Sequence, residues 1–324
     1  MTTLVTGATG LLGNNVVRSL LARGGSVRCL VRGTSDRRAL RGLEVEEVTG
    51  DVRSADAVGR AVEGVDLVVH AAALVGVGRR RMAEYRDVNV GGTMTVARAC
   101  SRRGVRLLHV SSVDTLPFGT RDDPTDESAP LATTLPVPYM VTKREAEEVV
   151  LGEVDRGLDA VVVHPGYLLG PWDWKPSSGR MLLAVARGRG LVAPCGGNDF
   201  CHVADVAEGV LAAAAVGATG SRYILSGEAL TYRAAFETFA RVTGAPGPLW
   251  TAPAGLLVAA GRVGDLVAAV AGVEPDLNSA SARAASMPHH FSSARARDEL
   301  GYESRPAETA ARDAWRWFRA RGYA

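Results

Sequence analysis

Residues 4–13 read LVTGATGLLG, in which a short apolar run is followed by glycines at positions 7, 10 and 13. The run before the glycines is typical of a buried strand, and the residues after them have the spacing of an apolar helix face. Gly7 permits a tight turn, Gly10 lets phosphate groups approach the backbone, and Gly13 allows the helix to pack closely on the strand. Such phosphates would lie at the helix N-terminus. The stretch therefore predicts the first strand, turn and helix of a dinucleotide-binding domain.

The glycine spacing, G-x-x-G-x-x-G, differs from the more common G-x-G-x-x-G, so the surrounding pattern carries much of the argument. Short runs that are mostly apolar throughout alternate with longer helical patterns, as expected of strands buried on both faces. The predicted strands are Thr3–Thr6, Ser26–Arg32, Val45–Thr49, Leu67–His70, Leu107–Ser111, Ala160–His164 and Arg222–Leu225. Helices are predicted at 11–24, at 85–104 and from Pro138 onward. The predicted fold class is α/β, with a Rossmann-type doubly wound parallel sheet.

The pattern changes after Pro165, where helices come to dominate. We expect residues 1–165 plus about 199–226 to form the dinucleotide-binding domain. Residues 166–198 plus 227–324 are expected to form a smaller, mainly helical substrate domain. The segment from Asp114 to Pro138 has no clear periodicity, and a loop of that length inside a domain is usually functional.

Composition excludes several classes of protein. The 324 residues are 47% hydrophobic and 22% charged, with a net charge of +2, so a strongly basic nucleic-acid-binding surface is not indicated. The four cysteines form no C-x-x-C pair, and we expect them to be reduced and the chain to hold no metal. No signal peptide is recognisable, and a cytoplasmic location is expected. The apolar stretch at 253–273 contains Arg262 and Asp265, which favours a buried or pocket-lining helix over a membrane span.

The last residue of the second predicted strand indicates which dinucleotide is bound. NAD sites carry an acid there for the ribose 2′-hydroxyl, whereas this chain has Arg32. A guanidinium suits a 2′-phosphate, so NADP(H) is predicted over NAD(H), although Asp36 lies close enough to compete for the acid's role. Asp51 stands where an adenine edge could be held. Small residues at Ala71–Ala73 leave backbone room beside a ribose.

A tyrosine and a lysine are spaced for catalysis. Only two of the 37 basic residues are lysines, and one of them, Lys143, follows Tyr139 by four residues on a predicted helix, so both lie on one face. The unperturbed pKa of a phenol is about 10, and a nearby ammonium lowers it. Ser111 and Ser112 close the fifth predicted strand, where parallel sheets bind ligands, and one of them is expected to hold a substrate oxygen.

Taken together, TGATGLLG, the SS pair and YMVTK resemble the extended short-chain dehydrogenase/reductase superfamily, also called NAD-dependent epimerases/dehydratases. The resemblance continues through GDV (50–52), HAAA (70–73), NVGGT (89–93) and HVADVAEG (202–209). LVRGTSDRRAL and GPWDWKPSSGR look most like the dihydroflavonol-4-reductase-like branch, which includes hopanoid-associated sugar epimerases. One departure is His164, where relatives often have Arg or Asn.

The resemblance implies a role for many positions. It implies catalytic roles for Ser112, Tyr139 and Lys143, with Asn89 supporting the active site. The cofactor-binding positions that it implies are Gly7, Thr9, Gly10, Leu11, Leu12, Gly13, Arg32, Asp51, Val52, Ala71, Ala72, Ala73, Tyr139, Lys143 and Pro165.

The expected reaction is reduction of a ketone or aldehyde by NADPH, or the reverse oxidation, with Tyr139 as general acid/base. A nucleotide-sugar epimerase with tightly bound NAD is the alternative, and a non-catalytic redox-sensing protein is a further one. Dehydration is disfavoured, because Val113 and Asp114 follow Ser112 where dehydratases carry an Asp-Glu pair.

The substrate is expected to be a small apolar or cyclic molecule, with neither nucleic acid nor membrane as a partner. Ser112, Tyr167, Trp172 and Trp174 are the predicted substrate contacts, although the tryptophans could equally pack the small domain. Cys195, Cys201 and His202 are interpreted as core or cleft lining, and His289 and His290 as a loop feature. A homodimer is compatible with this reading.

Overall fold

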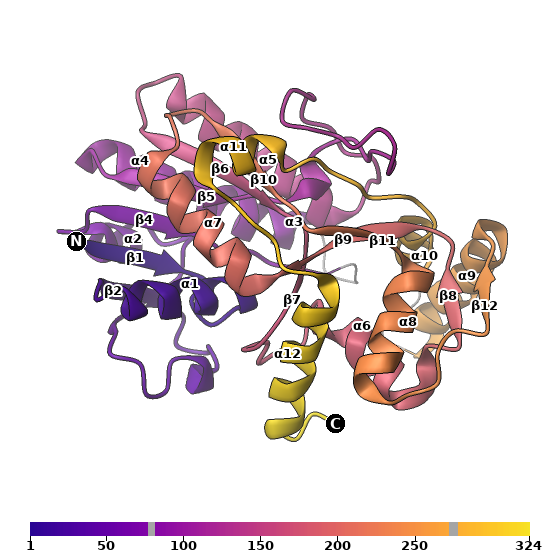
Figure 1. Cartoon of the computed structure of the whole chain (residues 1–324). Coiled ribbons are helices and arrows are strands. Elements are labelled where there is room, and N and C mark those ends of the chain that lie inside the picture. The colour runs from indigo at the N-terminus through magenta and orange to yellow at the C-terminus, as the bar shows by residue number, and fades with distance from the viewer. Residues whose placement is uncertain (77–81, 272–277) are drawn as a thin grey trace.

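A parallel sheet of seven strands forms the centre of the first part of the chain (Figure 1). The computed structural model describes residues 1–76, 82–271 and 278–324. The strand order is β10-β6-β5-β4-β1-β2-β3, and all neighbours run parallel. The strands are β1 (Thr2–Thr6), β2 (Ser26–Val31), β3 (Glu46–Thr49), β4 (Leu67–His70), β5 (Arg106–Val110), β6 (Ala160–Pro165) and β10 (Arg222–Leu225). Each end lies within one residue of its predicted position.

Helices cover both faces of this sheet, so the predicted doubly wound fold class is confirmed. On one face lie α1 (Leu11–Ala22), α7 (Val203–Val216) and α11 (Ala294–Leu300), and on the other α2 (Ala55–Val62), α4 (Gly92–Arg103) and α5 (Pro138–Val154). Successive residues of a strand point to opposite faces. Val5 accordingly packs in the core under α1, and Leu4 in the core under α2 and α4.

The predicted helix at 85–104 is interrupted. It consists of α3 (Met82–Tyr85), the π-helical turn η2 (Arg86–Gly91) and α4. Single π-helical turns inside helices are frequent at functional sites, because the extra residue re-aims a side chain. Here the turn contains Asn89. Three further short helical turns are η1 (Arg37–Ala39), η3 (Val113–Thr115) and η4 (Val185–Arg189).

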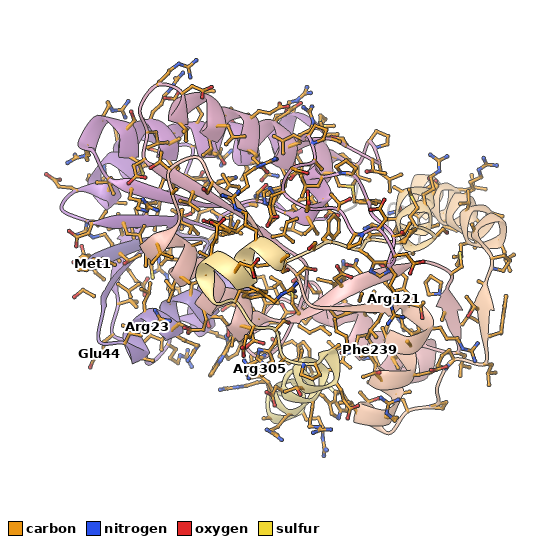
Figure 2. All side chains as sticks on the ribbon, turned by 45° about the horizontal axis from the view of Figure 1, so that its top comes forward. Met1, Arg23, Glu44, Arg121, Phe239 and Arg305 are labelled. Carbon is orange, nitrogen blue, oxygen red and sulfur yellow. The ribbon has the colours of Figure 1, made fainter. Side chains whose placement is uncertain are left out.

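The second part of the chain has its own core and two small sheets. The strands β7 (Tyr167–Leu169), β9 (Gly197–His202) and β11 (Glu228–Thr231) form one sheet, and β8 (Val192–Pro194) and β12 (Trp250–Ala252) form the other. The helices are α6 (Gly179–Ala184), α8 (Tyr232–Thr243), α9 (Ala254–Ala271), α10 (Ser279–Ala285) and α12 (Ala307–Ala320). Phe239, labelled in Figure 2, belongs to this second core, far from Met1 and Glu44 at the outer side of the main sheet.

We propose the same two-part division of the chain as the sequence suggested, refined at two segments. β10 and α7 do pack on the main sheet, whereas β9 pairs with β7 and β11 in the second part. The C-terminal segment serves both parts, because α11 packs on α7 and β10 while α12 packs on α8 and β9. In Figure 1 this yellow segment passes over the main sheet and ends in α12, beside α6 and α8.

The expectation of a buried or pocket-lining helix at 253–273 is wrong in its first part for α9. Leu256, Val263, Leu266 and Val267 are each at least half exposed, while Leu257 is buried against α10 and β12. A single-sided contact buries only one stripe of a helix, and these four side chains lie outside that stripe. Residues 272 and 273 lie outside the described part. No helix of that part is both long and apolar enough to cross a bilayer.

The long loop after β5 lies against the segment that follows α10. Gly119 forms an antiparallel bridge with His290, and Thr125 a parallel bridge with Phe291. The loop is therefore anchored between the two parts of the chain. It begins with η3, immediately after Ser112, and so shapes the edge of the sheet where the predicted catalytic residues lie.

Candidate active site

The turn between β1 and α1 brings backbone atoms too close together for any side chain. Gly7 has a φ of 74°, and a Cβ on it would lie 2.6 Å from the carbonyl carbon of Ala71. The Gly10 N–H closes the turn by donating to the Gly7 carbonyl at 2.9 Å. A Cβ on Gly13 would collide with that same carbonyl oxygen. Gly7 and Gly13 are thus required by a close approach of backbone, whereas a Cβ on Gly10 would meet only the Gly7 carbonyl oxygen, at 3.3 Å.

The start of α1 fits a pyrophosphate. The first helical hydrogen bond of α1 runs from the Asn14 N–H to the Gly10 carbonyl, 2.9 Å, so the N–H groups of Leu11 and Leu12 precede it. No side chain caps this helix and its first turn has no acidic residue. A helix N-terminus with open N–H groups attracts anions. Thr9, half-buried in the preceding turn, lies beside them.

Charged residues follow β2 and β3 in the chain. Two of the acids pair with arginines, and Arg32 forms no ion pair within the described chain. Asp36 accepts hydrogen bonds from Arg38, 2.7 Å, and Asp51 from Arg53, 2.9 Å. Hydrogen bonds from Arg53 lower the pKa of Asp51 against the effect of burial, and Arg32 adds to the lowering. Within the described chain Arg32 forms no ion pair, and it is exposed. Its guanidinium is available to an anion, and the competing Asp36 faces Arg38 instead.

The segment after β4 lies against the glycine turn. The Ala71 N–H donates to the Thr6 carbonyl, 3.2 Å, and the Ala72 N–H to the Thr6 hydroxyl, 3.3 Å. Ala73 is half-buried beyond them. Val52 is buried against the start of α4. These small side chains leave the backbone accessible along the edge of the sheet.

Asn89 braces this segment to α5. Its amide oxygen accepts from the Leu74 N–H, 2.7 Å, and its amide nitrogen donates to the Leu74 carbonyl, 3.1 Å, and to the Thr142 hydroxyl, 3.0 Å. Asn89 therefore links the segment that follows β4 to α5, the helix that carries Tyr139 and Lys143. This placement agrees with a supporting role.

Ser112 and Tyr139 come together at the carboxyl end of β5. Burial, followed by the charge of Asp114, raises the pKa of Tyr139, and the neighbouring Ser112 hydroxyl opposes this shift. The Ser112 hydroxyl also donates to the Asp114 carboxylate, 3.2 Å. Ser111 instead donates to Glu147 on the other side of the strand. Of the two serines, the structure brings Ser112 to the tyrosine.

Lys143 is buried and points at the sheet. Its Nζ donates to the Val110 carbonyl at 2.6 Å, and burial lowers its pKa to about 8 against the effect of Glu147. We expected Lys143 to lower the pKa of Tyr139. That expectation stays a prediction; within the described chain, burial, Asp114 and Ser112 are the causes that shift the pKa of Tyr139. The Lys143 ammonium group is hydrogen-bonded to the last residue of β5.

Two residues that sequence reasoning left out lie beside this pair. Burial raises the pKa of Asp114, and His289 and Ser112 oppose this. The ring of His289 stacks on Phe118, with centroids 3.8 Å apart, and its Nε2 bonds to the Ala284 carbonyl, 2.9 Å. Asp114 was visible next to Ser112, but the link to His289 joins residues far apart in the chain. No local pattern signals it.

His290 is more than a loop feature. Its Nδ1 lies 2.6 Å from Oδ1 of Asp199. The other carboxylate oxygen, Oδ2, accepts from the Phe291 N–H and the Ser226 hydroxyl. This buried carboxylate connects β9, the end of β10 and the segment before α11. The interaction is structural, because all of its partners lie inside the protein.

Of the predicted substrate contacts, the tryptophans contact the C-terminal helix. Trp172 and Trp174 pack on Trp317 of α12, and Arg18 of α1 covers the Trp172 ring, 3.3 Å from its centroid. These contacts agree with the alternative that the tryptophans pack the small domain, and contact with substrate stays a prediction. Tyr167 packs on Phe200, 5.0 Å between centroids, and donates to the Ser178 carbonyl.

The remaining candidates are Pro165 and three possible metal ligands. Pro165 ends β6, buried at the same edge of the sheet. Cys201 is buried, Cys195 is exposed, and His202 caps α7 by accepting from the Ala204 N–H. Across the described ranges, no three His, Cys, Asp or Glu side chains gather as a metal site would need. All four cysteines are free.

Comparison with known proteins gives a consistent picture. The profile described as "NAD dependent epimerase/dehydratase family" matches residues 3–225. "Sterol demethylase protein B" of Methylococcus capsulatus is 36% identical over 99% of both chains. A Synechocystis protein named as a dihydroflavonol 4-reductase is 31% identical over 98% of this chain and 95% of its own. The crystal structure of a nucleoside-diphosphate-sugar epimerase from Pseudomonas aeruginosa superposes with a TM-score of 0.83, at 26% identity, over 100% of this chain and 99% of its own.

Proposed function

Because the chain belongs to the NAD-dependent epimerase/dehydratase family of extended short-chain dehydrogenases/reductases, we propose that it interconverts a carbonyl compound and its alcohol with NADP(H). The observation that carries the proposal is the placement of Tyr139 against Ser112 at the carboxyl edge of the sheet. This edge is where ligands bind in open parallel sheets. The glycine turn and Asn89 lie at the same edge.

Each residue has a defined part in the proposed reaction. The bound nicotinamide cofactor supplies or accepts the hydride. Ser112 donates a hydrogen bond to the substrate oxygen, and Tyr139 donates its proton to that oxygen during reduction. Burial raises the pKa of Tyr139, which keeps the phenol protonated near neutral pH, the form that an acid requires. In the proposed reaction Lys143 binds the cofactor ribose and stabilises the phenolate that remains.

The proposed substrate is a compact alicyclic or aromatic molecule with a ring ketone or hydroxyl. The name of the Methylococcus relative refers to a sterol, and that of the Synechocystis relative to a dihydroflavonol. Both are ring compounds with little charge. Phe118, stacked on His289 beside Asp114, provides an apolar wall next to the reacting groups. We further propose that the protein acts from the cytoplasm on this small molecule, as a monomer or a homodimer.

The test is to follow NADPH absorbance with a panel of ring ketones and aldehydes. Wild-type protein should consume NADPH with at least one of them, and Tyr139→Phe should lower kcat by about a hundredfold to ten-thousandfold, the usual contribution of a general acid. Binding of NADPH should be unchanged. Tyr223→Phe is the matched control, since that hydroxyl donates to Glu299 at the far edge of the sheet. Full activity of Tyr139→Phe would reject the assignment.

The cofactor preference rests on Arg32. Since its guanidinium has no partner in the described chain, we expect Arg32→Ala to weaken NADPH binding by about tenfold to a hundredfold, as loss of charge-assisted hydrogen bonds would. NADH binding should hardly change. Fluorescence titration with both cofactors measures this, and Arg102→Ala, an exposed arginine on α4, controls for net charge. Wild-type protein that binds NADH more tightly would refute the preference.

A nucleotide-sugar epimerase is the second candidate, favoured by the structural similarity to the Pseudomonas epimerase. The observation against it is Arg32, which stands where an NAD site would carry an acid. Purified protein that retains NAD through chromatography and shows no net NADPH consumption would support the epimerase instead. Tight cofactor binding without turnover of any compound would point to a non-catalytic protein.

A further inference from the structure

A buried carboxylate lies beneath Lys143, and no step of the proposed reaction uses it. Glu147 follows Lys143 by four residues on α5, so both side chains lie on one helix face, and its exposed fraction is 0%. A carboxylate removed from water is stable only when donors or positive charges replace its hydration. The surroundings of Glu147 supply several such donors.

Three donors from three different elements hold the Glu147 carboxylate. The Ser111 hydroxyl, at the end of β5, lies 2.5 Å from one oxygen, and the Thr115 hydroxyl of η3 lies 3.0 Å from the same oxygen. His164 Nε2, on β6, lies 2.8 Å from the other oxygen. Burial raises the pKa of Glu147, but His164, Ser111 and Thr115 outweigh it, and the net shift is downward. The carboxylate is therefore ionised.

The other titratable groups around Lys143 bring no negative charge. His70 faces it from β4, and its pKa is lowered to about 3 by burial and by Lys143 itself. His109 faces it from β5, and its pKa is likewise lowered well below the usual value. Both imidazoles are neutral. On its own helix, Glu147 is the group that raises the pKa of Lys143, against the larger effect of burial.

We propose that Glu147 is a positioning residue of the active site: its fixed negative charge keeps the buried Lys143 side chain protonated. Ser111, Thr115 and His164 in turn keep the carboxylate in place. Only the catalytic consequence rests on the proposed function, since a neutral lysine could stabilise neither a phenolate nor the cofactor ribose hydroxyls as a triple donor. The charge of Lys143 is a property of the protein itself.

The composition of the chain allows a direct measurement. It contains only two lysines, Lys143 and Lys175, and Lys175 is exposed. Protein labelled with carbon-13 at the lysine Cε position, in a Lys175→Arg background, should give one lysine NMR signal, which reports the titration of Lys143. In Glu147→Gln we expect the pKa of Lys143 to fall by about one unit or more, the size of shift that a nearby opposite charge produces.

Glu153→Gln is the matched control. Glu153 lies on the same helix and is also buried, but it pairs with Arg98 and Arg156 at the other end. We expect no shift of the Lys143 signal in this variant. An unchanged Lys143 pKa in folded Glu147→Gln protein would overturn the proposal, and so would an equal shift in Glu153→Gln.

Glu147→Asp keeps the proposal testable if Glu147→Gln does not fold. It retains the charge but withdraws it by one methylene, so a Lys143 pKa between those of the wild type and Glu147→Gln is expected. A wild-type value would count against the proposal. If the wild type reduces a ketone, Glu147→Gln should lose more activity near pH 8 than near pH 6, because lysine deprotonation then begins at a lower pH. Failure of the ketone panel would reject the proposed function and leave the NMR result standing.

Discussion

At the scale of the residue, the pKa of Tyr139 is set by burial and by two neighbours, Asp114 and Ser112. The spacing of Tyr139 and Lys143 was read from the sequence, and the structure places both at the predicted edge of the sheet. The electrostatic effect of Lys143 on Tyr139 could not be predicted from their spacing, because it depends on which group accepts the lysine hydrogen bond. That bond goes to the Val110 carbonyl, while Asp114 acts on the phenol.

Asp114 therefore gives a specific prediction for alcohol oxidation. The reverse reaction needs Tyr139 as a base, so its rate should rise with pH through the pKa of the phenol. At such alkaline pH the Asp114 carboxyl is ionised, and its charge raises that pKa. Asp114→Asn removes the charge, so the rising limb should move to lower pH by about one unit. A pH profile of alcohol oxidation with NADP⁺ measures the shift.

Asp126→Asn is a suitable control for this experiment. Asp126 lies in the same loop but is exposed and accepts from Ser128. Its variant should leave the profile in place. A limb that does not move in Asp114→Asn would show that Asp114 has no electrostatic effect on the reacting phenol.

At the scale of the element, the parallel sheet gathers polar side chains where its strands end. His70 of β4 is the register partner of His109 on β5, and their rings lie 5.6 Å apart. His70 bonds to Thr6 of β1, 2.7 Å, and to Thr93 of α4, 3.0 Å. Both ring nitrogens of His109 lack a partner in the described chain. The strand sequences showed each histidine, but only the register shows that they are neighbours.

This row of histidines should make stability depend on pH. The pKa of His70 is lowered to about 3 in the folded protein, against about 6.5 unfolded, so the unfolded chain takes up the proton first. As the pH falls below about 6.5, the free energy of unfolding should decrease by up to about 1.4 kcal/mol per pH unit from this residue, until the pH reaches about 3. Above pH 6.5 the contribution is constant.

His70→Gln provides the comparison, because glutamine can bond to Thr6 and Thr93 without titrating. Denaturant unfolding between about pH 7 and pH 5 should show a flatter dependence for the variant than for the wild type. Equal slopes for the two proteins would mean that His70 is not held neutral by the fold.

At the scale of the whole molecule, the first part of the chain was far more predictable than the second. Strand ends in the main sheet were predicted to within one residue, because parallel strands buried on both faces, such as β4 and β6, are apolar runs. In the second part, short strands such as β8 carry too few residues to show a pattern. Composition also misled for α9, where Leu256, Val263, Leu266 and Val267 are at least half exposed.

Contacts between distant segments account for the rest of what the sequence did not show. The Asp199 carboxylate binds His290 and Phe291, ninety residues away, and the loop after β5 pairs with the same segment. Trp172 adopts a left-handed φ of 75°, which is rare for a bulky residue, and is held there between Arg18 and Trp317. Neither feature follows from local preference. Each exists because tertiary packing outweighs the local backbone preference.

The path of the C-terminal segment has a consequence for biosynthesis. Ala296 and Tyr302 fill the core of the main sheet, and Trp317 and Phe318 fill the core of the second part. A nascent chain that extends only to residue 290 therefore lacks residues that belong to both hydrophobic cores. The core of the main sheet cannot close before Tyr302 leaves the exit tunnel, nor that of the second part before α12 does, and a nascent chain would need protection from aggregation until then.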